Sequence, residues 1–435
     1  MIGSRRFAVY GGLFLLTFVS YVDRVNLSVA AAPIAATFRL SPIQLGYVFS
    51  AFLWTYVLLL IPMGIAADRF GGRTLTAAAL AVWSLAAVWT GLAASLPALY
   101  LARLALGAGE AANYPAGGHI ACAWAPRDER GLATACLNSG SYAGLCLGAP
   151  LVGWLVTVFG WRESFWIAGG LGLVLAAAWF ALYRAPEAAA WLTDAERAHI
   201  LSRRGPQGRT AGAASGLPVT RLLRSPSMWA LAITQGCTVY TSYLFMTWLP
   251  NYLAVSRGLD VLKSSLFTAI PYGIAALVGL AVGALSDRLL RQPGATSADR
   301  RKLIAGLLLA SSVILATPLV QPVWLILCLF GVSLSCVGTV AGLNIALTVD
   351  LLEDGAANGA AVSLLIVGGN TFGLAAPIVT GYVVAGTGGF AGAFLIAGAL
   401  LLAGALIVLL GARRPIRGAA PPLPAAPVPL RAASR

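Results

Sequence analysis

The chain has 435 residues, of which 59% are hydrophobic and only 10% are charged. A soluble globular protein carries about 25% charged residues, so this composition excludes an ordinary soluble enzyme and indicates a helical protein that crosses a membrane many times. The formal net charge of +14 would suggest a nucleic-acid partner only if it formed a patch on a soluble domain. Because the basic residues fall in particular loops, we expect no nucleic-acid partner.

A helix that spans a membrane needs about 20 mostly apolar residues. By this rule the sequence predicts an all-α membrane protein with twelve spans in two six-helix bundles, residues 1–184 and 227–412. The predicted spans are 7–33, 44–66, 74–94, 97–122, 131–157, 163–184, 227–251, 264–286, 302–319, 322–348, 357–385 and 389–412.

The segment 185–226 between the bundles is polar and rich in arginine. Thr193 and Glu196 have the spacing of a capping box, which predicts a short amphipathic helix ending near Arg204 on the membrane surface. We expect a loose linker at 205–216. The final residues, 413–435, have a Pro-Ala-Arg composition that predicts a disordered tail.

The distribution of basic residues predicts the orientation. If both termini face the cytoplasm, all but six of the 29 lysines and arginines lie on that side, as the positive-inside rule requires. The exceptions are Arg39, Arg162, Arg257 and Lys263 on the other side and Arg24 and Arg103 inside predicted spans. We therefore expect a protein of the bacterial-type cytoplasmic (inner) membrane, in contact with anionic lipid headgroups.

Four formally charged residues lie well inside the predicted spans: Asp23, Arg24, Arg103 and Glu110. A charge at the centre of a bilayer costs roughly 2.5–3.5 kcal/mol on insertion scales and usually marks a solute or ion pathway. Arg103 and Glu110 are two helical turns apart, so they share one face of their helix. Two structural ion pairs are the alternative, and the two interpretations are compatible because an exchanging pair can act as a switch.

Internal similarity supports two related halves. The stretch Gly64-x3-Asp68-Arg69-Phe70-Gly71-Gly72-Arg73 follows the second predicted span, and Gly283-x3-Asp287-Arg288 follows the eighth. Two similar halves around a midplane site are typical of secondary transporters. We assign gating contacts to these loops, whose alternative role is that of solvated surface. The residues concerned are Asp68, Arg69, Arg73, Asp287 and Arg288.

The stretch at 64–73 resembles the loop motif of the major facilitator superfamily. Within that superfamily the chain resembles the anion:cation symporters, which include bacterial sugar-acid permeases for galactonate and glucarate. The resemblance covers all twelve spans and is strongest in the first half. Its residues include Tyr21-Val-Asp23-Arg24, Ser50-Ala-Phe-x3-Tyr56, Arg103-x6-Glu110 and Thr247-Trp248-Leu-Pro250.

The resemblance implies roles for individual residues. Asp23 and Glu110 match proton acceptors, and Arg24 matches the arginine that binds the anionic substrate. Arg103 would pair with the carboxylates and adjust their proton affinity. Further candidate substrate contacts are Tyr21, Tyr56, Ser141, Gln235, Tyr243, Asn344 and Asn370. Ordinary core tyrosines and hydrogen bonds between helices are the alternatives for Tyr56 and the two asparagines.

Two positions depart from the sugar-acid permeases. Their glutamine in the fifth helix is Ser141 here, and their glutamine in the second helix is Leu60. Fewer groups therefore remain to recognise hydroxyls, and Tyr240 and Tyr243 lie near Gln235. We expect a substrate with fewer hydroxyls than an aldonate, such as a small or aromatic carboxylate.

Charge counting favours proton coupling. Two cations and two anions make the empty site nearly neutral, so a substrate carboxylate leaves a net negative charge that favours proton uptake by Asp23 or Glu110. The sequence thus predicts import of an organic anion with protons, with the proton as coupling ion and no other cofactor or metal. We expect a monomer without catalytic residues.

Three other classes are weighed against this hypothesis. Motifs for nucleotide-driven pumping, serine hydrolysis, zinc proteolysis and dinucleotide binding do not occur in the sequence, which argues against an enzyme or an ATP-driven pump. An efflux antiporter for drugs or metabolites is the main alternative, since Gly148-Ala-Pro150-x2-Gly153 resembles an antiporter motif. Arg24 argues against it, because a cationic drug gains little from a guanidinium in its pocket. A sensor that moves no solute is the third option.

Overall fold

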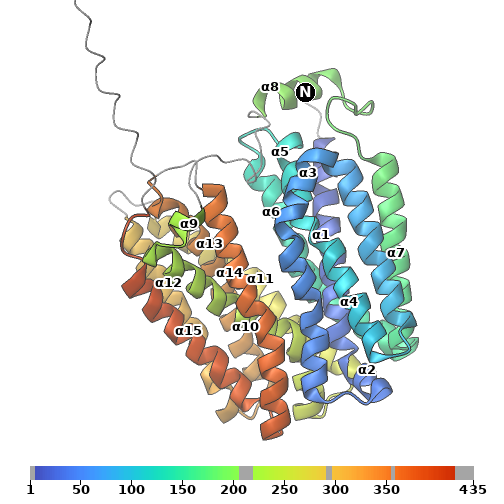
Figure 1. Ribbon diagram of the computed structural model, residues 1–435, viewed down its shortest axis with the longest axis vertical. Coiled ribbons are helices and arrows are strands. Elements are labelled where there is room, and N and C mark those ends of the chain that lie inside the picture. Colours follow the sequence, from blue (N-terminus) through green and yellow to red (C-terminus); the bar gives the residue numbers. More distant parts are fainter. Residues whose placement is uncertain (1–4, 205–218, 291–295, 354–357, 417–435) are drawn as a thin grey trace, which may run out of the picture.

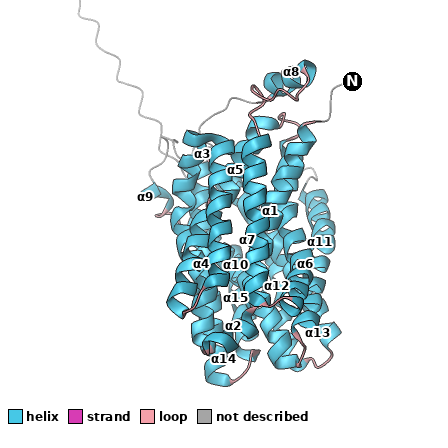
Figure 2. Cartoon of the chain, turned by 90° about the vertical axis from the view of Figure 1, so that its right-hand side faces the viewer, coloured by secondary structure: helices cyan, strands magenta, loops and turns pink. Residues whose placement is uncertain are grey.

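The computed structural model describes residues 5–204, 219–290, 296–353 and 358–416. In these ranges the chain is helical, and it forms two bundles that lie side by side (Figure 1). Figure 2, turned by 90°, shows the long helices running roughly parallel to one another along the long axis. The predicted linker at 205–216 and most of the predicted tail lie outside the described residues.

The first bundle contains seven helices. The break in α3 is at Gly71, whose φ of 71° lies in the left-handed region that glycine adopts readily, so this one assigned helix joins the predicted spans 44–66 and 74–94. The predicted span 97–122 is divided into α4 and α5 directly after Glu110. The helices are α1 (Arg6–Val29), α2 (Ala31–Phe38), α3 (Pro42–Leu92), α4 (Leu96–Glu110), α5 (Asn113–Trp124), α6 (Arg130–Val158) and α7 (Trp161–Leu182).

The second bundle follows two short helices, α8 (Asp194–Arg203) and α9 (Val219–Leu222). Its elements are α10 (Pro226–Arg257), α11 (Val261–Leu290), α12 (Ser297–Ser311), the 3-10 segment η1 (Ser312–Leu319), α13 (Val323–Leu351), α14 (Asn358–Thr387) and α15 (Ala391–Gly411). Among the described residues nine helical segments are long and apolar enough to cross a membrane. The twelve-span count stays a prediction.

The two ends of the molecule differ. We call the end where α1 begins and α15 ends the terminal face, and the end that carries α2 the opposite face (Figure 1). At the opposite face the bundles touch through reciprocal glycine contacts. A Cβ on Gly46 would lie 2.6 Å from the carbonyl oxygen of Pro377, and one on Gly381 would lie 2.6 Å from that of Pro42. Backbones approach this closely only where glycine leaves room.

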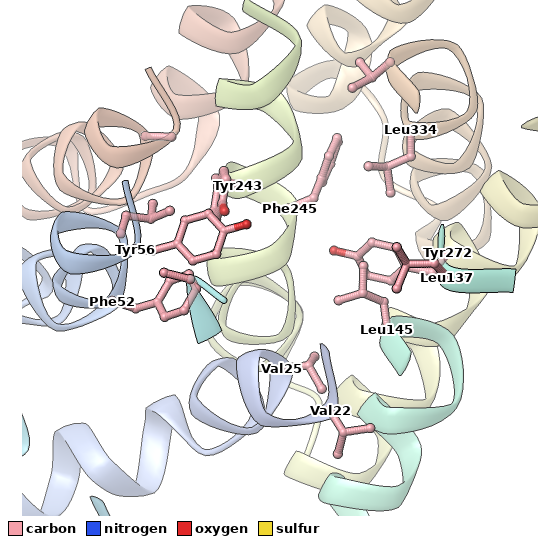
Figure 3. Packing of buried hydrophobic residues seen from close by; sticks show 14 of the residues in the cluster. Val22, Val25, Phe52, Tyr56, Leu137, Leu145, Tyr243, Phe245, Tyr272 and Leu334 are labelled. Carbon is pink, nitrogen blue, oxygen red and sulfur yellow. The ribbon is translucent and has the colours of Figure 1, made fainter. Parts of the chain in front are cut away.

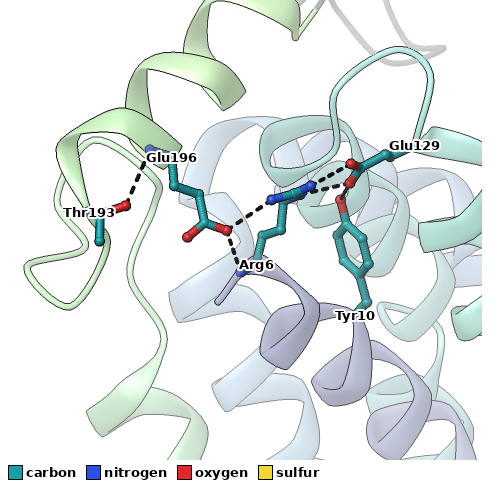
Figure 4. A network of polar contacts seen from close by, with 5 residues as sticks. All are labelled: Arg6, Tyr10, Glu129, Thr193 and Glu196. Carbon is teal, nitrogen blue, oxygen red and sulfur yellow. Dashed lines mark hydrogen bonds and ion pairs between the residues drawn. The ribbon is translucent and has the colours of Figure 1, made fainter. Parts of the chain in front are cut away.

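The segment between the bundles is attached to the first bundle at the terminal face (Figure 4). Arg6 donates from its backbone N–H and from Nη1 to Oε1 of Glu196 on α8, both at 3.1 Å. Arg6 also binds Glu129 at 2.6 Å, and Tyr10 donates to that carboxylate at 3.1 Å. Only half of the expected capping box forms. Thr193 accepts from the Glu196 N–H at 3.3 Å, whereas the Glu196 carboxylate binds Arg6.

Candidate functional site

An ion pair joins the last third of α1 to the end of α4. Arg24 donates from Nε to Oε2 of Glu110 at 2.7 Å, and Ser20 donates from Oγ to the same oxygen at 2.8 Å. Ser20 and Arg24 are one turn apart on α1, so both face Glu110. Arg24 is 6% exposed and Glu110 is fully buried. The sequence-predicted cation and anion therefore meet inside the first bundle.

Aromatic rings enclose the Arg24 guanidinium. Its central carbon lies 4.6 Å from the ring centres of Tyr21 and Phe52 and 5.0 Å from that of Tyr56. These are cation–π distances, which stabilise a charge without a second carboxylate. The Nη2 atom is buried and has no hydrogen-bond partner among the described residues. Arg24 thus keeps one unused hydrogen-bond donor, Nη2, although aromatic rings lie against its guanidinium.

Two further tyrosines complete the surroundings. The hydroxyl of Tyr114 on α5 lies 3.4 Å from that of Tyr21. Tyr243 on α10 comes from the second bundle and interacts electrostatically with Arg24. Figure 3 shows its hydroxyl directed toward that of Tyr56. The second bundle therefore contributes to the same site as the first.

Sequence reasoning missed three residues that contact this cluster: Ser20, Phe52 and Tyr114. Each is four residues from one that it selected, because Ser20 precedes Arg24, Phe52 precedes Tyr56 and Tyr114 follows Glu110. Residues four apart on one helix share a face, as Ser20 and Arg24 do on α1 and Phe52 and Tyr56 do on α3. For these two the signal was present in the sequence, whereas Tyr114 lies on α5, beyond the break that follows Glu110.

Asp23 and Arg103 interact electrostatically with the ion pair, but their buried polar atoms form no hydrogen bond with it. Each is 2% exposed. Both carboxylate oxygens of Asp23, and Nε and Nη1 of Arg103, have no hydrogen-bond partner in the described part of the chain. Arg103 interacts electrostatically with Glu110 and Asp23. The expected pairing of Arg103 with the carboxylates is thus a longer-range attraction rather than a hydrogen-bonded contact.

The remaining predicted substrate residues bind other groups of the protein. Ser141 donates to the carbonyl oxygen of Asn138 at 2.6 Å, and Asn370 donates to that of Ile366 at 2.9 Å, each within its own helix. Asn344 on α13 donates from Nδ2 to Oε1 of Gln235 on α10 at 3.0 Å. The structure therefore brings Gln235 and Asn344 together.

The predicted gating residues lie at the terminal face. Asp68 is 3.6 Å from Nδ1 of His119 on α5. Arg73 donates to the carbonyl oxygen of Phe180 at 2.8 Å and lies over the ring of that residue. The Arg69 guanidinium is 5.4 Å from the ring centre of Phe70. On the second bundle, Asp287 and Arg288 lie near the end of α11, and Asp287 lines the cavity described next.

A cavity of about 1020 Å³ separates the bundles toward the terminal face. Its walls come from both bundles, mainly from α6, α11 and α13, and it reaches from Cys146 to Asp287 and Arg300. Most of its lining is glycine, alanine and leucine. The buried charges are not in this wall. Tyr142 is, and it interacts electrostatically with Tyr21 of the charged cluster.

Residues 13–357 match the sequence model of the Major Facilitator Superfamily. The chain belongs to this superfamily. It is therefore a multi-pass membrane transporter and not an enzyme. The loop motif at 64–73, the two bundles and the buried charges found above agree with this assignment.

Two relatives of this chain are named as probable transporters of organic acids. The chain is 30% identical to the probable galactarate/D-glucarate transporter GudP of Escherichia coli K12, over 90% of each chain. It is 33% identical to the probable sulfoacetate transporter SauU of Cupriavidus necator, again over 90% of each chain. A crystal structure of a bacterial homolog of the human lysosomal transporter Spinster, inward-facing and unoccupied, has a TM-score of 0.75 at 22% identity and covers 94% of this chain and 98% of that one. This last likeness shows the fold.

Proposed function

We propose that this protein imports an organic anion together with protons by alternating access. The substrate is a small carboxylate or a sugar acid, and both termini face the cytoplasm of a bacterial-type inner membrane. The relatives named for galactarate, glucarate and sulfoacetate support an anionic substrate. The excess of basic residues in the loops that adjoin the terminal face supports the orientation.

One observation carries the proposal. Arg24 is buried in the first bundle, is held by Glu110 on one side, and retains Nη2 without a hydrogen-bond partner among the described residues. The edge of the guanidinium that carries this unused donor can bind a carboxylate oxygen, and arginine's planar fork suits the two-oxygen geometry of a carboxylate. The surrounding rings exclude water, which strengthens the attraction. An anion that binds this edge would also contact Tyr243, so that both bundles hold it.

The charge of the cluster supports proton coupling. Asp23, Arg24, Arg103 and Glu110 sum to zero when all are ionised, and a bound carboxylate makes the sum negative. The unpartnered, buried carboxylate of Asp23 is then the group that gains most from a proton. Importing a lone anion against an inside-negative potential costs about 2.3 kcal/mol per charge per 100 mV, and one accompanying proton removes this cost.

Alternating access requires one closed and one open end. The glycine contacts between Gly46 and Pro377 and between Gly381 and Pro42 close the opposite face. The cavity between α6, α11 and α13 extends toward the terminal face, where it reaches Asp287 and Arg300. With the termini in the cytoplasm, this arrangement is the inward-facing state of the cycle, from which an imported anion leaves.

Uptake by proteoliposomes tests the proposal. Purified protein is reconstituted, an acid-outside pH gradient is imposed, and accumulation is measured for labelled sugar acids, dicarboxylates and aromatic acids. We expect concentrative uptake of at least one anion, lost when the gradient is collapsed. Arg24→Ala should abolish uptake, and Lys263→Ala, which removes an exposed cation at the opposite face, should not.

Three outcomes would contradict the proposal. They are unchanged uptake by Arg24→Ala, exchange of cationic drugs but not anions against protons, and transport of no solute. Because removing Arg24 leaves Glu110 buried without its partner, the double variant Arg24→Ala/Glu110→Gln is measured alongside. It restores a neutral pair of side chains and separates loss of binding from loss of folding.

A further inference from the structure

The amide and hydroxyl side chains predicted to recognise the substrate form hydrogen bonds within the protein, whereas aromatic rings surround Arg24. Ser141, Asn344 and Asn370 donate hydrogen bonds, and Gln235 accepts one. We propose that Asn344 sets the selectivity of this transporter by holding Gln235, so that the site prefers a carboxylate with a flat, sparsely hydroxylated body over a polyhydroxylated sugar acid. This inference rests on the proposed function, in which Arg24 binds the carboxylate.

The first step is the pairing of Gln235 and Asn344. Nδ2 of Asn344 is 3.0 Å from Oε1 of Gln235 and also 3.0 Å from the carbonyl oxygen of Leu231. Asn344 is fully buried and Gln235 is 6% exposed, so both amides are fixed in the interior between α10 and α13. Asn344 Oδ1 is an acceptor of this pair that has no partner among the described residues, and it can serve a single hydroxyl.

The second step is that the other two predicted polar side chains, Asn370 and Ser141, already form hydrogen bonds inside their own helices. Asn370 donates to the carbonyl oxygen of Ile366, and Ser141 donates to that of Asn138, each within its own helix. A hydroxyl group that enters a buried site without a partner costs about 1–3 kcal/mol. A sugar acid carries a hydroxyl on nearly every carbon of its chain, so it would pay this cost repeatedly.

The third step concerns the aromatic side chains around Arg24, where the anion would bind. Tyr21 and Tyr56 lie against the Arg24 guanidinium, and Tyr114 and Tyr243 adjoin them. Tyr272 on α11 is 3% exposed, and Figure 3 shows its hydroxyl directed into the interior between the bundles. Aromatic rings stack on flat, apolar bodies and offer one hydroxyl each. This set favours an aromatic or otherwise planar carboxylate.

The backbone of α14 fixes the position of the Tyr243 ring. A Cβ on Gly373 of α14 would lie 2.6 Å from the Tyr243 ring, so the ring rests directly on that backbone and cannot withdraw. Gln235 is about two turns away on the same helix. Along α10 the site therefore offers a rigid ring close to Arg24 and, farther toward the terminal face, an amide that Asn344 holds.

Ligand-induced thermal stabilisation of the purified protein tests this inference. The probes are 4-hydroxybenzoate and D-galactonate, and the dissociation constant for each is obtained from the shift in unfolding temperature with concentration. For the wild type we expect 4-hydroxybenzoate to bind at least about tenfold more tightly, a ratio of the size that unpaired hydroxyls produce. Arg24→Ala/Glu110→Gln should bind neither.

The decisive variant is Asn344→Ala, which frees the Gln235 amide. We expect the preference for 4-hydroxybenzoate to fall by about threefold or more, mainly through tighter binding of D-galactonate. The matched control is Thr371→Ala, which removes an exposed hydroxyl bonded within α14 and should leave the ratio unchanged. Because the readout is a ratio of two ligands on one protein, a general loss of stability does not produce it.

The failure of this inference is distinguishable from failure of the proposed function. If the wild type binds D-galactonate as tightly as 4-hydroxybenzoate, or if Asn344→Ala leaves the ratio unchanged, the assignment of Asn344 is overturned while anion import stands. If neither probe binds, the inference is likewise overturned. The proposed function fails only when the uptake assay also shows no anion transport.

Discussion

Nε of Arg24 on α1 donates to Oε2 of Glu110 on α4 across 2.7 Å, and neither side chain reaches solvent appreciably. In the proposed function this contact joins two roles. Arg24 would bind the anion, and Glu110, which is hydrogen-bonded to it, would take up a proton. When a substrate carboxylate approaches Arg24, it competes directly with Glu110. Proton uptake by Glu110 would then release the guanidinium.

The first prediction concerns Glu110→Gln. Glutamine keeps an oxygen that can accept from Arg24 and Ser20 but cannot take up a proton at neutral pH. We expect accumulation driven by a pH gradient to fall to equilibrium levels, while exchange of internal for external substrate continues. Radiolabel uptake and counterflow in the same proteoliposomes measure the two activities. Retained concentrative uptake would remove Glu110 from the coupling scheme, and Glu187→Gln, which alters a surface ion pair with Arg204, is the control.

The second prediction separates charge from shape at Arg24. Lysine retains the positive charge but lacks the planar fork that binds two carboxylate oxygens. We expect Arg24→Lys to keep part of the anion binding, with a Kd raised about tenfold or more, whereas Arg24→Ala loses it. The measurement is substrate-induced thermal stabilisation. Equal affinity of Arg24→Lys and the wild type would show that only the charge matters and that the free Nη2 edge has no special role.

Arg24→Ala also carries a stability prediction. Truncation leaves Glu110 buried with Ser20 as its remaining hydrogen-bond donor. Removing one partner of a buried ion pair typically lowers the free energy of unfolding by about 3–5 kcal/mol. The unfolding temperature of Arg24→Ala should therefore drop, and adding Glu110→Gln should recover most of the loss. If the double variant is no more stable than the single one, the ion pair is not what stabilises the contact between α1 and α4.

Much of this architecture could be predicted from the sequence because it depends on local patterns. Apolar segments of spanning length indicated the helices, and the cost of buried charge indicated Asp23, Arg24, Arg103 and Glu110. The partner of each charge could not be predicted in the same way. Arg24 rather than Arg103 meets Glu110 because of how α1 and α4 pack, which sequence spacing along one helix does not determine.

Contacts between segments that are far apart in the chain could not be predicted from the sequence either. Thr193 and Glu196 have capping-box spacing, yet Glu196 binds Arg6, almost two hundred residues earlier in the chain. A charged partner in a buried position outcompetes the local backbone N–H, because an ion pair with hydrogen bonds is stronger than a neutral contact. Likewise, nothing in the sequence indicated that Gln235 pairs with Asn344. Their hydrogen bond depends on how α10 packs against α13.

The third prediction concerns closure of the opposite face. In Gly46→Ala the new Cβ would lie 2.6 Å from the carbonyl oxygen of Pro377, which is closer than carbon and oxygen atoms normally approach. The contact forms only when this face is closed, so the variant should shift the population toward the state that is open there. Distances between spin labels on α3 and α14 at the opposite face should lengthen, and uptake should slow by about tenfold.

The matched control is Gly306→Ala on α12, where an added Cβ meets no atom within 4 Å. It should change neither the distance distribution nor the uptake rate. The reciprocal variant Gly381→Ala, directed at the carbonyl oxygen of Pro42, should act like Gly46→Ala. If both variants leave the distances unchanged, the two bundles do not separate at this face during the cycle.

The fourth prediction uses the Arg6 network, which joins Glu129 of the first bundle and Glu196 of α8. The hydrogen bond from Arg6 holds the pKa of Glu129 below its ordinary value of 4.5. A carboxyl whose pKa is lowered on folding stabilises the protein above its unfolded pKa, and this contribution is lost as the pH falls through the folded value. The thermal stability of the wild type should therefore fall more steeply below about pH 4.5 than that of Glu129→Gln. Parallel pH profiles for the two proteins, measured by intrinsic fluorescence in detergent, would show that the contact between Arg6 and Glu129 does not stabilise the protein.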